Sequence, residues 1–160
     1  MTFSYNSPGM APGTSFFDDP SVGPFHVVAG IHIGAMSKLP HGHNIHSVVT
    51  VADQPGLVPD GVSHKHLPLS YQSMNQDTLL EAVLWTLEQV HLEHTVLIRS
   101  ERGLQRPALV AATVVLHMGG WYFDAMTCVK KANPKALTDF RYLNMLKETD
   151  KFFRGEAATR

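Results

Sequence analysis

The stretch TVLIRSERGLQRPALVAATVVLHM, residues Thr95–Met118, combines an apolar strand, a polar turn and an apolar helix. Five residues separate Ser100 from Arg106, and a glycine occupies the fourth position of this turn. In such a turn the backbone N–H groups, the positive end of the following helix and one arginine can converge on a single anion. The pattern predicts an anion-binding loop made of Ser100, Glu101, Arg102, Gly103, Leu104, Gln105 and Arg106.

The alternative is a loop that binds no anion. Arg106 would then pair with Glu101 or another carboxylate, and Ser100 would cap the helix that follows. Because an arginine fork suits carboxylates as well as three-oxygen anions, the sequence leaves both interpretations open. Arg99 and Arg102 add local positive charge, although Arg99 could equally form a salt bridge on the surface.

The composition is that of a soluble protein with one core. The chain has 160 residues, of which 44% are hydrophobic and 17% charged, and its formal net charge is -1. That charge argues against a nucleic-acid or membrane partner recruited by electrostatics alone. Cys128 is the single cysteine, so an intramolecular disulfide is impossible and a reducing compartment fits better. We expect a soluble, cytoplasmic protein, or one incorporated into a larger particle, that needs no cofactor.

Residues 1–24 have the composition of an extended arm, with four prolines, three glycines and no hydrophobic period. The arm carries more aromatic residues than a purely solvated tail needs. We therefore expect its aromatic side chains to contact a partner protein or a neighbouring copy of the chain, and these residues are Phe3, Tyr5, Phe16 and Phe17.

Strand and helix patterns alternate along the rest of the chain. Two short strands joined near Gly30 are expected within 25–34, and a short helical piece over 35–39. Further strands are expected at 45–51, 62–69 and 95–98, and helices from 73–77 to 90, 107–117, 121–132 and 137–153. This order predicts an α/β fold in which helices cover a central sheet. The anion loop would then lie at the carboxyl end of a strand, where open α/β sheets bind ligands.

Four segments, in order, resemble the domain of dual-specificity protein phosphatases. They are FHVVAGIHIGAM (25–36), HNIHSVVTVADQPGLVPDGV (43–62), HKHLPL (64–69) and WYFDAMTCVKKANP (121–134). The anion loop is similar to the phosphate-binding loop of that family, His-Cys-x-x-Gly-x-x-Arg followed by serine or threonine. The resemblance implies a phosphatase-like domain over 25–154, which follows the extended arm over 1–24 and leaves a C-terminal tail over 155–160.

The residues that carry catalysis in that family are replaced here. Ser100 stands at the cysteine position, Arg99 at the histidine position and Pro107 at the hydroxyl position after the arginine. A serine hydroxyl cannot ionise as a thiolate does near neutral pH. The general-acid loop of the family corresponds to residues 70–76, SYQSMNQ, which contain no carboxylate, and Asp77 is expected to cap a helix instead.

The sequence therefore predicts a catalytically inactive phosphatase fold that serves as a protein-binding or structural module. It could be a subunit of a larger assembly such as a virion, with phosphate or a phosphorylated ligand in the loop. The alternative is an active phosphatase, captured with an engineered Cys→Ser change or using a noncanonical nucleophile.

Other notable residues have structural interpretations that we favour. His41, His43 and His46, and separately His64 with His66, could suggest a metal site, but no cysteine or carboxylate accompanies them and no metal site is predicted. Cys128 is expected in the core. Trp121, Tyr122 and Phe123 cannot all face one core from a helix, so at least one should be exposed.

Overall fold

The computed structural model describes residues 23–36, 44–70 and 75–155. Within them a five-stranded sheet has the order β1-β2-β5-β3-β4. The strands are β1 (Phe25–Val28), β2 (Ile31–Ala35), β3 (Ser47–Thr50), β4 (Ser63–His66) and β5 (Val96–Ser100). β1 is antiparallel to β2, and the other neighbouring pairs are parallel. The segment 95–100 therefore supplies the middle strand, which is hydrogen-bonded on both sides.

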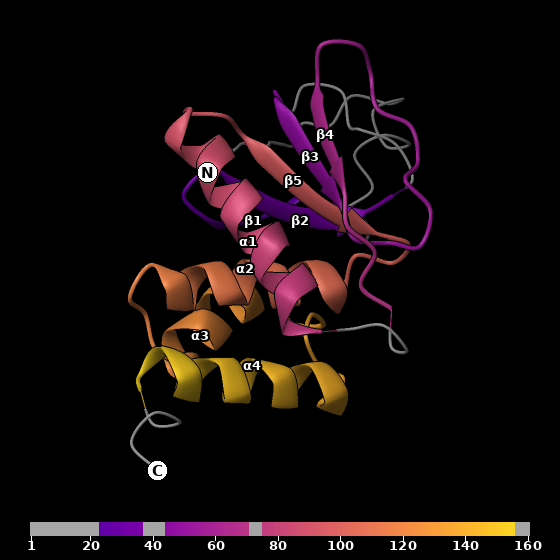
Figure 1. Cartoon of the computed structure of the whole chain (residues 1–160). Coiled ribbons are helices and arrows are strands. Elements are labelled where there is room, and N and C mark those ends of the chain that lie inside the picture. Colours follow the sequence, from indigo (N-terminus) through magenta and orange to yellow (C-terminus); the bar gives the residue numbers. More distant parts are fainter. Residues whose placement is uncertain (1–22, 37–43, 71–74, 156–160) are drawn as a thin grey trace, which may run out of the picture.

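The described helices lie on one side of this sheet (Figure 1). They are α1 (Gln76–His91), α2 (Arg106–His117), α3 (Tyr122–Ala132) and α4 (Phe140–Phe153). α2 packs directly on the sheet and also contacts α1, α3 and α4. Every residue of α2 from Pro107 to Leu116 is buried. This central position explains why the helix is apolar on all sides.

The two faces of the sheet differ in chemistry because strand side chains alternate. Ile33, Val49 and Ile98 belong to the apolar core beneath the helices. Leu97 and Arg99 alternate with Ile98 on β5, and they point to the opposite face. Both are buried as well, so the middle strand is covered on both sides.

Most of the expected strands and helices are confirmed, but several begin or end at other residues than predicted. β5 runs two residues beyond Ile98, because Ala35 of β2 and Thr50 of β3 pair with Ser100 and Arg99. Ala35, which was expected to begin a helical piece, is the last residue of β2. The remainder of that piece from residue 37 lies outside the described residues.

Two helix starts were predicted wrongly. Asp77 does not cap α1, because Asn75 occupies the N-cap and its side chain accepts the N–H of Thr78, while Asp77 lies in the first turn. The last helix begins at Phe140 rather than Leu137. Leu137 has a positive φ of 54°, which ends any helical path there.

The predicted arm falls almost entirely outside the described residues, and so do its aromatic residues Phe3, Tyr5, Phe16 and Phe17. Residues 156–160 of the predicted tail also lie outside them. Among the residues that are described, no helix has the length and apolar character required to cross a membrane.

Candidate functional site

The Ser-x5-Arg loop connects the carboxyl end of β5 to the first turn of α2. Ser100 is the last residue of β5 and Arg106 the first of α2. Gly103, at the fourth position, has a φ of +75° and is packed against the backbone of β2. A Cβ atom there would lie 2.3 Å from the carbonyl carbon of Gly34 and 2.5 Å from the nitrogen of Ala35. The loop therefore needs glycine at this position for two reasons, its left-handed backbone and its close contact with β2.

The hydroxyl of Ser100 is engaged inside the loop. Its Oγ accepts the backbone N–H of Gly103 at 3.1 Å, and the residue is only 3% exposed. The N-cap of α2 is Gln105, which makes no side-chain capping bond. In the alternative interpretation Ser100 would cap the helix, and that part of it is wrong because the hydroxyl accepts a hydrogen bond inside the loop.

Arg106 is held at the rim of the loop by carboxylates. One guanidinium nitrogen pairs with Oε1 of Glu101, and the other lies 3.9 Å from Oδ1 of Asp53 and 3.4 Å from the carbonyl oxygen of Leu69. Burial alone would raise the pKa of the Glu101 carboxyl. Hydrogen bonds from the backbone of Glu101 and Asp53, together with the Arg106 charge, outweigh burial and lower that pKa. Glu101 is thus ionised near neutral pH and paired with the loop arginine.

Arg99 does not contribute to the mouth of the loop. It is 2% exposed and lies on the sheet face away from the helices. Its Nε donates to Thr50 Oγ1 at 2.9 Å, and Nη2 donates to the carbonyl oxygens of Pro55 and Leu57 at 3.1 and 3.0 Å. The expectations of charge beside the anion or of a surface salt bridge are therefore wrong. Burial lowers the pKa of Arg99, and the guanidinium secures the turn after β3.

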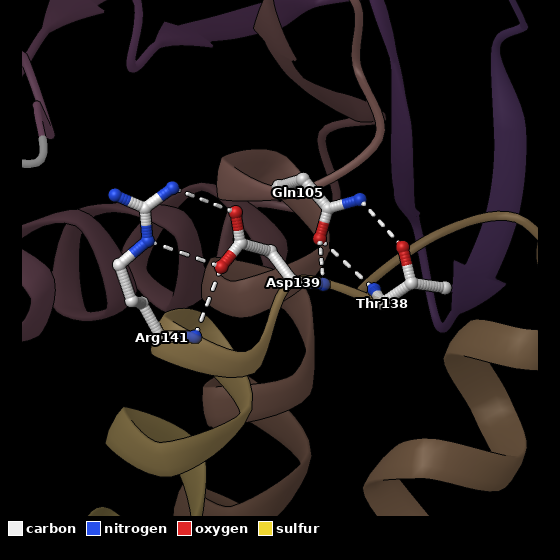
Figure 2. A network of polar contacts seen from close by, with 4 residues as sticks. All are labelled: Gln105, Thr138, Asp139 and Arg141. Carbon is white, nitrogen blue, oxygen red and sulfur yellow. Dashed lines mark hydrogen bonds and ion pairs between the residues drawn. The ribbon is translucent and has the colours of Figure 1, made fainter.

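A polar network joins the end of the loop to the start of α4 (Figure 2). Gln105 Oε1 accepts the backbone N–H groups of Thr138 and Asp139 at 2.9 and 2.8 Å, and its Nε2 donates to Thr138 Oγ1. Asp139 caps α4 by accepting the N–H of Arg141, whose guanidinium also donates to both carboxylate oxygens. The loop and the beginning of α4 are therefore positioned as one unit.

A cleft of about 600 Å³ opens over the loop. Six of the seven predicted loop residues line it, and Gly103, which is buried against β2, does not. Five lining residues come from elsewhere in the chain, and they are Asp53, Ser70, Thr138, Asp139 and Tyr142. Asp53 carried only a turn signal in the sequence, and Tyr142 carried no signal of a site. Their place in the cleft depends on contacts between distant segments.

The arrangement of strand, loop and helices matches solved structures. A mouse putative dual specificity phosphatase complexed with zinc tungstate is 20% identical, with a TM-score of 0.76 over 96% of this chain and 97% of that one. The chain has the dual-specificity phosphatase fold. Human DUSP28 is 20% identical, with a TM-score of 0.71 over 82% of this chain and 96% of its own.

The same fold is found in the human tyrosine phosphatase-like serine/threonine/tyrosine-interacting protein. It is 15% identical, with a TM-score of 0.71 over 81% of this chain and 97% of that one. No protein-family model matches the sequence, and the search of curated proteins gives no match either. The structural similarity thus establishes the dual-specificity phosphatase fold. Because the sequence identities are low, it establishes the fold alone.

Of the five histidines considered as metal ligands, the three that lie in described segments make hydrogen bonds within the fold. His46 Nδ1 accepts the N–H of Thr95 at 2.9 Å, His64 Nε2 lies 2.9 Å from Thr50 Oγ1, and His66 Nε2 lies 2.8 Å from the carbonyl oxygen of Ala52. No group of three potential metal ligands occurs in the part of the chain that the structure describes. His41 and His43 lie outside that part.

The remaining expectations concern the burial of Cys128 and of the aromatic triplet at 121–123. Cys128 is half-buried and packs against the core, as expected. Trp121 is 60% exposed and Phe123 76% exposed, whereas Tyr122 packs against the core. The prediction that this aromatic triplet has exposed members is confirmed.

Proposed function

We propose that this chain is a catalytically inactive phosphatase-fold protein that binds a phosphorylated group in the cleft over the Ser100–Arg106 loop. One observation carries the proposal. The residue at the nucleophile position of the loop is a buried serine whose Oγ accepts the Gly103 N–H inside the loop.

The chemistry of phosphate-ester cleavage supports the same proposal. Attack on phosphorus needs an ionised or base-activated nucleophile, and a serine hydroxyl is a far weaker acid than a thiol. Departure of the alcohol needs a general acid, and residues 70–76 contain no carboxylate. The loop therefore lacks the nucleophile and the general acid of the family's reaction, while the glycine and the arginine that suit anion binding remain.

The retained parts of the loop support oxyanion binding. Arg106 lies at the first turn of α2, beside the loop backbone and the cleft, and its side chain is 19% exposed. A helix N-terminus with an arginine fork suits tetrahedral oxyanions. The related mouse structure was solved with zinc tungstate, and tungstate is such an oxyanion. This supports a phosphate-like ligand for the cleft.

Turnover of an aryl phosphate tests the catalytic half of the proposal. We expect no release above the buffer rate from this protein, and none from Ser100→Cys, because the acid loop still lacks a carboxylate. Strong recovery by Ser100→Cys would instead favour the alternative of an active enzyme trapped by an engineered serine. Ser100→Cys combined with Arg106→Ala is the control for release that does not depend on the loop.

Thermal unfolding in a titration of inorganic phosphate tests the binding half. A ligand that binds only the folded state raises Tm, and the rise grows with the ratio of ligand concentration to Kd. We expect phosphate to raise the Tm of this protein and of Arg154→Ala, which removes an arginine that pairs with Asp150 at the end of α4. Arg106→Ala should lose that response. An equal response of the two arginine variants would mean that the loop does not bind phosphate.

The proposal includes a protein partner or a neighbouring copy of the chain. Exposed aromatic residues of the helical layer support it, since large aromatic side chains are enriched in protein interfaces. These residues are Trp121, Phe123, Phe140 and Phe152. Membership of a larger assembly such as a virion was predicted from the arm, and it stays a prediction because those residues lie outside the described part of the chain.

A further inference from the structure

The anion loop already holds an anion from its own chain. The carboxylate of Glu101 pairs with Arg106 and is favoured in its ionised form by backbone hydrogen bonds of Glu101 and Asp53. The Asp53 carboxylate lies 3.9 Å from the same guanidinium. An arginine and backbone N–H groups are also the donors that an external phosphate would use.

A phosphate that uses both terminal nitrogens of the Arg106 guanidinium must therefore displace Glu101 from Nη2. The cost of this exchange depends on where the displaced carboxylate goes. Glu101 is 53% exposed and Asp53 64% exposed, so neither is trapped in the interior and both can turn toward a new cation at the mouth of the cleft. A site built for a bare anion would carry an excess of positive charge, and here the two carboxylates of Glu101 and Asp53 lie beside Arg106.

The charge balance of the occupied cleft indicates what the ligand must bring. A phosphate monoester carries about two negative charges near neutral pH, which the two lining arginines, Arg102 and Arg106, can balance. Asp139 remains paired with Arg141. Asp53 and Glu101 would then lack a cation. A ligand with its own positive charge beside the phosphate restores the balance.

The shape of the cleft allows such a ligand. Its volume of about 600 Å³ is in the range of sites that hold a small molecule or several side chains, and it extends from the loop to Tyr142 on α4. Asp53 lies beyond the end of β3, 3.9 Å from the Arg106 guanidinium, and lines the same cleft. A phosphorylated side chain can occupy the loop while a neighbouring residue of the same segment reaches the carboxylates.

We propose that the cleft selects a phosphorylated protein segment with a basic residue next to the phosphorylated one, because Glu101 exchanges its bond with Arg106 for one with the ligand's cation. This inference rests on the proposed function of phosphate binding, and it adds a requirement for the ligand. Glu101 acts in two ways, as an internal competitor of simple anions and as the acceptor for the basic residue.

Calorimetric titration with four probes tests the inference. The probes are a phosphoserine peptide with an arginine on each side, the same peptide with glutamine on each side, the unphosphorylated arginine peptide, and inorganic phosphate. We expect the first to bind at least about tenfold more tightly than the second, which corresponds to about 1.4 kcal/mol, and the unphosphorylated peptide to bind more weakly than either.

Glu101→Gln separates the role of this carboxylate from that of overall charge. Without the internal competitor, inorganic phosphate and the glutamine-flanked peptide should bind more tightly, and the preference for arginine should shrink. Glu88→Gln removes the same charge from an exposed position on α1 and should leave all four affinities unchanged.

The outcomes distinguish the two proposals. Equal affinity for the arginine- and glutamine-flanked phosphopeptides, with phosphate binding intact, would overturn this inference and leave the proposed function standing. Equal binding of the phosphorylated and unphosphorylated arginine peptides would overturn it too, because the phosphate would then play no part. Failure of every phosphorylated probe to bind would overturn both.

Discussion

Gly103 shows how a single residue can fix the shape of the loop. Its backbone lies in the left-handed region, and its α-carbon is packed against Gly34 and Ala35 of β2. A side chain here meets backbone atoms, which cannot rotate away as the end of a flexible side chain can. Because the N–H of this residue also donates to Ser100 Oγ, any shift of Gly103 alters the nucleophile position as well.

Gly103→Ala should therefore be much more costly than an ordinary glycine substitution. We expect a loss of about 3 kcal/mol in the free energy of unfolding, from left-handed strain and from overpacking against β2. Gly61→Ala is a matched control, since Gly61 has a φ of +87° but no atom within 4 Å of the added Cβ. It should lose only about 1 kcal/mol, the strain alone. Urea unfolding measures both, and equal losses would contradict the role of the β2 contact.

At the scale of elements, the face of the sheet away from the helices carries a row of hydrogen-bonded polar side chains. Arg99 on β5, Thr50 on β3 and His64 on β4 are joined by hydrogen bonds of 2.9 Å through Thr50 Oγ1. Burial is the largest cause that lowers the pKa of His64 below its ordinary value, and the charges of Arg99 and His66 add to it. The row therefore favours a neutral imidazole at this position.

This lowered pKa predicts a pH dependence of stability. The unfolded chain binds a proton at His64 near pH 6.5, whereas the folded chain binds it only at lower pH. Stability from His64 is thus fully present above pH 6.5 and is lost as the pH falls from there toward the folded pKa. Relative to His64→Gln, which does not titrate, the protein should lose at most about 1 kcal/mol, because the imidazole is partly exposed and water screens it.

Urea unfolding at several pH values and NMR titration of the His64 ring measure this effect. In Arg99→Met the His64 pKa should rise but stay below its unfolded value, since burial remains. A difference between the protein and His64→Gln that stayed constant over the whole acidic range would contradict the assignment.

At the scale of the whole molecule, α2 connects every layer. It contacts the strands β1, β2 and β5 on one side and the helices α1, α3 and α4 on the others. Because the helix begins with Arg106, the same element borders the candidate site and fills the core. The site and the core should therefore unfold together.

A substitution that creates a cavity at α2 tests whether the site and the core unfold together. Leu109 is fully buried, and Leu109→Ala should cost about 3–5 kcal/mol without splitting the unfolding transition. Far-ultraviolet circular dichroism and tryptophan fluorescence should report the same midpoint, since Trp85 lies on α1 and Trp121 precedes α3. Ala125→Gly on α3 is a milder comparison within the same core. Two separate midpoints would mean that the molecule does not unfold as one cooperative unit.

The sequence by itself determined the elements, their order and the composition of the loop. These are local properties, because hydrophobic periodicity and turn residues act over a few positions along the chain. For the same reason the sequence predicted that Ser100, Gly103 and Arg106 lie between one strand and one helix. It also contains no carboxylate in residues 70–76. The fold expected from its resemblance to dual-specificity phosphatases is the fold that the structure has.

Only the tertiary structure decided which groups surround that loop. The sequence left open whether Arg106 pairs with Glu101, and it gave no reason to bring Asp53 or Tyr142 to the same cleft. It also could not assign Arg99 to the far face of the sheet, because that depends on how far β5 stays paired with its neighbours. The physical reason is common to these cases: the partners of a charged side chain come from segments distant in sequence, and packing alone brings them within bonding distance.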